Sequence, residues 1–252
     1  MTTDITRTLE AGVLTLSFNR PDKKNAITQA MYAALCDAVE GARVDDAVRV
    51  VLFRAEGDSF SAGNDIQDFI AIGSQSEPAD MSVFRFLKAL ADLDKPAVAA
   101  VRGRAVGIGL TLLLHCDLVV VADDALLSVP FVNLALAPEA ASTLLLPAVI
   151  GHQRAFELFA LGEPITGAQA VAWGLANRSV PAVEVEDQAR ALADKLATRA
   201  PNSIRRTKAL MRDAERLWTI MQAEGRVFSD QMRSPEAMEA FAAFMQKRAP
   251  KF

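Results

Sequence analysis

Two short segments combine glycine with polar residues in a way that can build an oxyanion-binding site. The first has the sequence FSAGND over 60–65, and the second has VRGRAVGIG over 101–109. Each is predicted to join a strand to a helix. Glycine lets the backbone adopt positive φ or approach a ligand closely, and a helix N-terminus exposes unpaired N–H groups at the positive end of its dipole. If the segments face each other, they can stabilise the negative oxygen of a thioester enolate.

Either segment alone is more often structural, because glycine-rich turns are common between strands and helices. The second segment is not a dinucleotide-binding fingerprint. Its glycines follow GxxxGxG rather than GxGxxG, and no acidic residue lies at the expected distance on a following strand.

The elements that must position these segments are read from hydrophobic periodicity and turn residues. Apolar strands alternate with helices, which predicts an α/β fold with crossover connections. A helix is also expected to begin at Gly107, helices are expected to dominate after Glu139, and the region from 201 to the end is expected to be wholly helical. The predicted strands are 5–9, 13–18, 48–54, 97–101 and 117–122, and the predicted helices are 29–43, a short one from Asp65 to Ile72, and 81–92, with a flexible loop over 73–80.

Composition narrows the class of protein. With 252 residues, 51% of them apolar, the chain can bury a large core in one domain or in a domain with a small appendage. Its net charge of -4 gives no sign of nucleic-acid binding. Two distant cysteines fit a reducing, cytoplasmic location, and the two histidines have no metal-ligand spacing, so no metal site is expected. No secretory signal and no membrane span are apparent.

Several separated motifs resemble the enoyl-CoA hydratase/isomerase (crotonase) superfamily in order and spacing. They are SFNRPDKKNAIT (17–28), DSFSAGNDIQDF (58–69) and KPAVAAVRGRAVGIGLTLLLHCDLVVVADDALLSVPF (95–131), and EAMEAFAAFMQKRAPKF (236–252) resembles the family's usual ending. The resemblance covers nearly the whole chain. It implies that a thioester carbonyl accepts hydrogen bonds from the N–H groups of Asn64, after Gly63, and Ile108, after Gly107. The family usually has glycine at the position of Ile108, but only the N–H is needed.

The acid–base residues separate the members of this superfamily. The resemblance places the two glutamates of the hydratases at Thr111 and Phe131, and neither side chain can do the work of a glutamate. Glu139 follows Pro138, as in the peroxisomal type of Δ3,Δ2-enoyl-CoA isomerase, which also carries GND in its first loop. By this resemblance Glu139 is the sole acid–base residue, and Thr111→Ala is expected to change little.

Other interpretations of these residues stay open. Glu139 also fits a glutamate at a helix N-terminus that serves only the dipole. The protein can instead be a hydratase or another lyase with an unfamiliar acid–base set, or a non-catalytic acyl-CoA-binding paralogue. The sequence His115-Cys116-Asp117 is interpreted as core and strand start, because adjacent residues cannot converge as a triad.

The resemblance also implies residues for binding coenzyme A, whose thioester is expected as substrate, with no permanently bound cofactor. They are Lys23 or Lys24 near the nucleotide with Asn25 and Ala26 close by, Ala62 and Asp65 through their backbone, and Lys208 at a phosphate. Surface lysines are usually only solvated. Asp65 is expected mainly to cap and orient its loop. Ile66, Phe69 and Ile70 either line the acyl pocket or belong to the core.

The family fold implied by the resemblance is a spiral of repeated β-β-α units. The chain is accordingly divided into a core with the acyl-CoA site over 1–195 and a helical C-terminal region over 196–252. That region is expected to mediate a homotrimer, or a hexamer made of two trimers.

Overall fold

The computed structural model of the protein describes residues 3–67 and 82–252. The predicted loop over 73–80, most of the predicted helix over 65–72, and the pocket candidates Phe69 and Ile70 lie outside the described residues.

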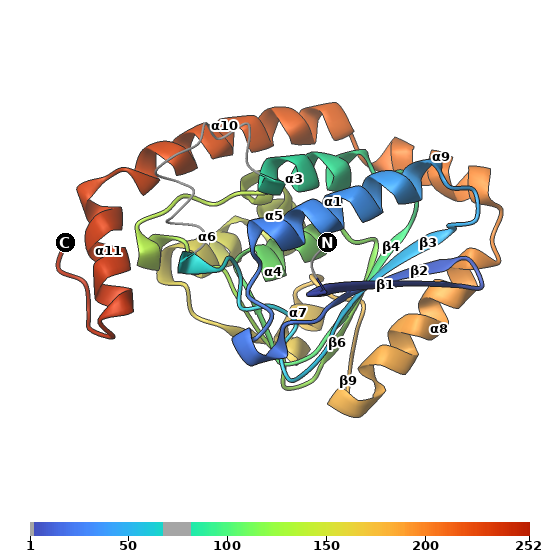
Figure 1. The fold of residues 1–252 in the computed structure, drawn as a ribbon, viewed down its shortest axis with the longest axis horizontal. Coiled ribbons are helices and arrows are strands. Elements are labelled where there is room, and N and C mark those ends of the chain that lie inside the picture. Colours follow the sequence, from blue (N-terminus) through green and yellow to red (C-terminus); the bar gives the residue numbers. More distant parts are fainter. Residues whose placement is uncertain (1–2, 68–81) are drawn as a thin grey trace.

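A six-stranded sheet forms the centre of the molecule (Figure 1). The first two strands make an antiparallel hairpin, and every later neighbour pairs in parallel. Parallel strands are buried on both faces, which explains why AVAAV and LVVVA carry no polar residue. In sheet order the strands are β1 (Ile5–Glu10), β2 (Val13–Phe18), β3 (Val50–Ala55), β4 (Ala97–Val101), β6 (Leu118–Ala122) and β9 (Arg178–Val180).

Helices cover both faces of this sheet (Figure 1). α1 and α3 pack together on one side, α10 lies over α3, and α8 packs against β3, β4 and β6 on the other side. The helices are α1 (Gln29–Val44), α3 (Ser82–Asp92), α4 (Ile108–Thr111), α5 (Ser142–Ile150), α6 (His152–Leu161), α7 (Gly167–Ala172), α8 (Val185–Ala197), α9 (Pro201–Met211), α10 (Ala214–Met232) and α11 (Pro235–Met245). Short 3-10 turns occupy 21–23, 112–115, 132–134 and 182–184.

A second sheet of three very short strands lies beside the loops that were singled out from the sequence. β5 (Arg104–Val106) pairs in parallel with β7 (Leu126–Ser128), which pairs antiparallel with β8 (Ile165–Thr166). An isolated parallel bridge joins Ser61 to Ala105. The small sheet therefore brings the loop after β3 next to the segment that precedes α4.

Most of the elements predicted from periodicity are confirmed, with boundaries that differ by one or two residues. Thr28 caps α1, since its side chain accepts a hydrogen bond from the N–H of Met31. Two expectations are wrong. The run after Gly107 forms only four residues of α-helix before a 3-10 turn over 112–115, and residues 246–252 are not helical.

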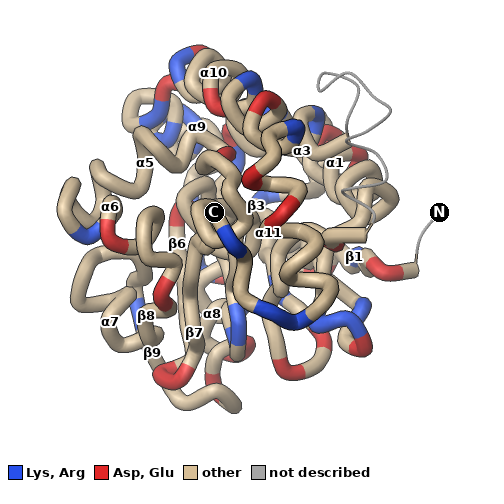
Figure 2. The backbone as a smooth tube through the Cα atoms, turned by 90° about the vertical axis from the view of Figure 1, so that its left-hand side faces the viewer, with Lys and Arg blue, Asp and Glu red and all other residues tan. Residues whose placement is uncertain are grey.

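The C-terminal helices share the core of the rest of the chain. Leu217, Met221 and Phe228 of α10 and Ala237 of α11 belong to the same buried apolar cluster as the strands. Basic and acidic residues are interspersed along this region rather than separated by sign (Figure 2). Within the described residues no helix is long and apolar enough to cross a membrane.

Candidate active site

The two glycine-bearing segments lie side by side, which is the arrangement that a shared oxyanion site requires. The Phe60 N–H donates to the carbonyl of Arg102 at 2.9 Å, and the Ser61 N–H donates to that of Arg104 at 2.9 Å. In return, the Val106 N–H donates to the carbonyl of Ser61 at 2.9 Å. Three backbone hydrogen bonds thus fix the spacing between the segment after β3 and the segment before α4.

Glycine is required by geometry at two positions in these segments. Gly63 has φ of 91°, and a Cβ atom there would lie 3.0 Å from the carbonyl oxygen of Val106. Gly107, immediately before α4, has φ of 54° with ψ of −119°. L-residues rarely adopt such backbone angles. These glycines allow the two segments to turn sharply and still touch.

The N–H groups that follow these glycines are not used by the regular structure around them. The parallel bridge between Ile27 and Asn64 uses the carbonyl of Gly63 and the N–H of Asp65, which leaves the Asn64 N–H outside the ladder. Ile108 is the first residue of α4, so its N–H has no acceptor in a preceding helical turn. Both groups are therefore suited to bind an oxyanion.

The turn over 20–26 is anchored to the first segment by a buried asparagine. The Asn25 side chain donates to the carbonyls of Glu56 and Ser59 at 2.8 and 2.7 Å and accepts from the Arg20 N–H at 2.8 Å. Asn25 has φ of 55°, a left-handed conformation that asparagine tolerates better than most residues. The motif NRPDKKNA thus builds a rigid turn against the loop that carries Asn64.

Glu139 is buried, with 8% of its surface exposed, and it reaches the second segment. The hydroxyl of Thr111, at the end of α4, donates to Oε1 of Glu139 at 2.7 Å. Burial raises the pKa of the Glu139 carboxyl to about 8, the Thr111 hydrogen bond lowers it, and the charge of Glu224 raises it. The structure therefore joins a strongly basic carboxylate to the helix that begins with Ile108.

Replacing Glu139 by glutamine is expected to stabilise the protein at alkaline pH. A carboxyl whose pKa is raised in the folded state, here from 4.5 to about 8, contributes stability at low pH that is lost as pH rises through this window. The free energy of unfolding of Glu139→Gln should exceed the parent's by roughly 2–4 kcal/mol at alkaline pH. Under mildly acidic conditions the difference should nearly vanish. Denaturant unfolding at two pH values, with the exposed Glu215→Gln as control, checks this, and a pH-independent difference would contradict it.

Replacing Thr111 by alanine was expected to change little, and the structure gives this residue a contact that the sequence did not indicate. Threonine cannot replace a glutamate as a proton carrier, but its hydroxyl holds Oε1 of Glu139 in place. The other hydratase position holds no carboxylate: Phe131 is buried, with its ring centroid 6.3 Å from that of Phe159.

Tyr32 was missed by the sequence analysis, because a tyrosine on the inner face of a helix looks like a core residue. Its hydroxyl donates to Oδ1 of Asn64 at 2.6 Å, so it orients this side chain beside the proposed oxyanion donor. Burial raises the pKa of the Tyr32 phenol well above its usual value, and the charge of Glu139 raises it further. Tyr32 thus hydrogen bonds to Asn64 and also lies near enough to Glu139 to feel its charge.

The residues expected to bind coenzyme A divide into two groups. Lys23 and Lys24 are exposed on the anchored turn, with Ala26 partly exposed behind them. The N–H groups of Ala62 and Asp65 donate to the carbonyls of Lys24 and Ile27, both at 2.9 Å. Backbone contacts from Ala62 and Asp65 to a ligand are therefore confined to their carbonyl oxygens.

Asp65 and Ile66 lie directly after the Asn64 N–H. The Asp65 carboxylate accepts from Arg20 at 2.7 Å and from the Gln67 N–H at 3.1 Å, which is the capping and orienting role expected from the sequence. Ile66 is partly exposed and, like Gln67, has helical conformation.

Lys208 lies apart from this site. Its ammonium is buried and donates to Asp117 at 2.7 Å and to the carbonyl of Lys95 at 2.8 Å. These partners precede β6 and β4, whereas the oxyanion segments follow the other ends of the strands. Within this chain, Asp117 therefore compensates the buried charge of Lys208, which does not face the site. His115 hydrogen bonds to the backbone of Ala140 and Asp117 pairs with Lys208, so the two do not form a triad.

No group of three or more His, Cys, Asp or Glu side chains lies close enough to hold a metal ion in residues 3–67 and 82–252. The site built here consists of two backbone donors, one buried carboxylate and the hydroxyls that orient them. Such a set can stabilise an enolate and move a proton.

Comparison with known proteins identifies the family of this chain. The family model described as Enoyl-CoA hydratase/isomerase matches residues 8–252. Enoyl-CoA delta isomerase 2 of Rattus norvegicus is 34% identical over 96% of this chain, which spans 63% of that protein. The 1,2-epoxyphenylacetyl-CoA isomerase of Escherichia coli (strain K12) is 35% identical over 97% of this chain and 96% of its own length.

A solved structure of an enoyl-CoA hydratase/isomerase from Pseudoalteromonas atlantica T6c shares the fold with a TM-score of 0.93. It is 40% identical, and the match covers 99% of this chain and 100% of that one. The spiral of β-β-α units inferred from the resemblance is thereby confirmed as the fold class. The chain belongs to the enoyl-CoA hydratase/isomerase family.

Proposed function

We propose that this protein is a Δ3,Δ2-enoyl-CoA isomerase in which Glu139 is the only acid–base residue. The observation that carries the proposal is the environment of this carboxylate. It is buried, Thr111 holds its Oε1, and in the described part of the chain its Oε2 has no hydrogen-bond partner. Oε2 is therefore the atom that can take a proton from a substrate.

The proposed reaction uses the two N–H donors and the carboxylate in turn. The thioester oxygen accepts hydrogen bonds from the N–H groups of Asn64 and Ile108, which makes the C2 proton of a 3-enoyl-CoA more acidic. Oε2 of Glu139 removes that proton, and the electron pair of the C–H bond delocalises into a dienolate whose oxygen is held by both N–H groups. Glu139 then returns the proton at C4, and the double bond ends between C2 and C3. One carboxylate suffices because it acts as base and then as acid.

The same site lacks what hydration requires. Placing and activating a water molecule takes a second acid–base group in the hydratases, and the corresponding positions hold Thr111 and Phe131. Neither of these side chains can exchange a proton near neutral pH. This favours isomerisation over hydration.

For the coenzyme A end of the substrate we propose the exposed turn that carries Lys23, Lys24 and Ala26. The position of this turn supports the proposal, because the carbonyl of Lys24 accepts a hydrogen bond from the N–H of Ala62, two residues before Asn64. Two exposed ammonium groups there suit the phosphates of a nucleotide. Ile66 is a candidate for the acyl side.

We also propose that the helical region over 196–252 packs on neighbouring subunits to form a trimer. Its surface carries several large apolar side chains that a single chain leaves in solvent, which marks an interaction surface. They are Leu210, Met211, Val227, Met238, Phe244, Met245 and Phe252.

The experiment that tests the function uses the purified protein with 3-hexenoyl-CoA and, separately, with crotonyl-CoA. The absorbance of the conjugated enoyl thioester is followed in both. A rise with the 3-enoyl substrate supports the isomerase. A fall with crotonyl-CoA would replace it by a hydratase, and no change with either would favour an acyl-CoA binder.

Thr111→Val is expected to shift the pH dependence of the reaction. The hydroxyl stabilises the ionised form of Glu139, so its loss should raise the pKa of this carboxyl above its present value of about 8. The rising limb of kcat/KM against pH should move to higher pH, and activity at neutral pH should fall by roughly 3–30-fold, because such a hydrogen bond to a charged group contributes about 1–2 kcal/mol. A pH–rate profile measures this.

The control for Thr111→Val is Thr15→Val, which makes the same change at a buried position of β2. An unshifted limb in Thr111→Val, or an equal shift in both variants, would contradict the role assigned to the hydroxyl.

A further inference from the structure

The backbone directly after Glu139 has an unusual conformation. Ala140 and Ala141 are consecutive left-handed residues with φ of 64° and 55°, and both are almost fully buried. Alanine disfavours this region because its Cβ approaches the backbone too closely. Two such residues in a row persist only where the surroundings hold them.

Two buried polar side chains provide that support. Nε2 of His115 lies 2.8 Å from the carbonyl oxygen of Ala140. The carboxylate of Glu224 accepts hydrogen bonds from the Ala141 N–H at 2.6 Å and from the Thr143 N–H at 2.9 Å. The Thr143 hydroxyl also donates to Glu224.

Glu224 does for α5 what a capping residue does locally for other helices. Ala141 occupies the N-cap position of α5 and has no side chain that can accept a hydrogen bond. Glu224, which lies on α10, accepts hydrogen bonds from the otherwise unpaired N–H groups at the start of α5. Its negative charge faces the positive end of the dipole of that helix. The side chain of Glu224 therefore fixes the N-terminus of α5, two residues after Glu139, although it lies 83 residues away from Ala141 in the sequence.

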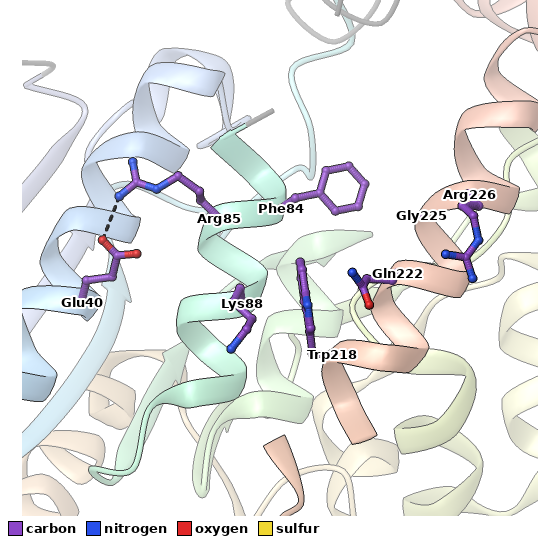
Figure 3. Close-up of a pocket in the computed structure, with 8 residues that line it drawn as sticks. All are labelled: Glu40, Phe84, Arg85, Lys88, Trp218, Gln222, Gly225 and Arg226. Atoms are coloured by element: carbon purple, nitrogen blue, oxygen red, sulfur yellow. Dashed lines mark hydrogen bonds and ion pairs between the residues drawn. The ribbon is translucent and has the colours of Figure 1, made fainter. Parts of the chain in front are cut away.

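The packing of α10 explains why Glu224 reaches this point. The next residue, Gly225, lies against α3, and a Cβ atom there would be 2.5 Å from Cε1 of Phe84. Figure 3 shows Phe84 pointing from α3 toward α10, where Gly225 lies. This close approach allows α10 to pack tightly against α3. Glu224, with 7% of its surface exposed, points into the interior.

We propose that Glu224 is a positioning residue for catalysis: its carboxylate holds the backbone of Ala141 so that the Glu139 side chain stays against Thr111 and faces the two oxyanion donors. The inference rests on the proposed role of Glu139. Glu224 itself makes no proton transfer, because its oxygens are occupied by Ala141 and Thr143.

Glu224→Gln tests the inference with almost no change in volume. The amide nitrogen of glutamine must face either the Ala141 N–H or the Thr143 N–H, so one of the two bonds becomes a contact between donors. We expect kcat for 3-hexenoyl-CoA to fall by about 10–100-fold, as for a misplaced catalytic group. KM should stay within about threefold, because the proposed substrate contacts are untouched.

A second readout does not depend on catalysis. Hydrogen–deuterium exchange of the amides over 139–143 should become at least about tenfold faster in Glu224→Gln, because a lost hydrogen bond lowers the cost of local opening. The matched control is Glu215→Gln, which makes the same replacement on an exposed turn of α10. It should leave kcat and exchange unchanged.

A milder variant keeps the test usable if Glu224→Gln does not fold. Thr143→Val removes only the hydroxyl bond to Glu224 and should lower kcat severalfold at constant KM. The inference is overturned if kcat in the folded variant stays within twofold of the parent, or if kcat and KM change as for a loss of substrate binding.

The two proposals fail in different ways. If Glu139→Gln retains full isomerase activity, the acid–base role proposed for Glu139 is wrong, and the exchange over 139–143 still decides whether Glu224 holds this segment. If exchange is unchanged in Glu224→Gln, the positioning role is wrong even where Glu139 proves essential.

Discussion

Glu139→Gln is expected to lower kcat for 3-hexenoyl-CoA by about 10³–10⁴-fold, the upper part of the range for general acid–base catalysis. The effect should be this large because the same carboxylate is proposed to carry out both proton transfers, and glutamine can carry out neither. The amide oxygen can still accept the hydrogen bond from Thr111, so the side chain should keep its place. Steady-state kinetics by enoyl thioester absorbance give the measurement.

Binding provides the control for this variant. The dissociation constant of the 2-enoyl-CoA product, measured by calorimetry, should change by less than about threefold, because the two N–H donors and the exposed lysines are untouched. Loss of binding together with turnover would point to a structural role for Glu139. Retention of more than a tenth of the parent's kcat would exclude it as the acid–base residue.

Gly63→Ala is expected to produce the second largest loss of activity. At φ of 91° an added Cβ atom lies 3.0 Å from the Val106 carbonyl oxygen, so the chain must move where it presents the Asn64 N–H. Misplacing one oxyanion donor should lower kcat/KM by about 10²–10³-fold. The forced left-handed alanine should also lower the free energy of unfolding by roughly 1–2 kcal/mol. Kinetics and thermal unfolding measure the two effects.

Gly41→Ala is the matched control, because Gly41 lies within α1 and an added Cβ atom there has no neighbour within 4 Å. This variant should keep full activity and be slightly more stable, as alanine is the better helix former. If Gly63→Ala behaves like Gly41→Ala, the close contact with Val106 does not position the donor.

The sequence predicted five of the six strands of the large sheet, all but β9, because these strands depend on local patterns. Unbroken apolar runs such as AVAAV have few alternatives to a buried parallel strand. The second sheet could not be predicted, since β5, β7 and β8 have only three, three and two residues and show no period. It is this sheet that holds the segment before α4 next to Ser61.

The sequence could indicate those residues of the candidate site that are proposed to act through their own backbone N–H group or carboxylate. Asn64, Ile108 and Glu139 could be chosen because a family resemblance supplied their spacing. Tyr32, His115 and Glu224 could not, because each acts on a residue that lies far away in the sequence. Lys208 illustrates the same point. Nothing near it in the sequence indicates that its ammonium pairs with the carboxylate of Asp117, 91 residues earlier.

The long separation between Glu224 and Ala141 has a consequence for the order in which the chain assembles. The backbone hydrogen bonds that join strands β1–β6 and the two oxyanion segments to one another need no residue beyond β7. The turn after Glu139 is completed only when α10 docks, which closes a loop of 83 residues. During synthesis, the scaffold can therefore form before the proposed acid–base residue, Glu139, is fixed in place.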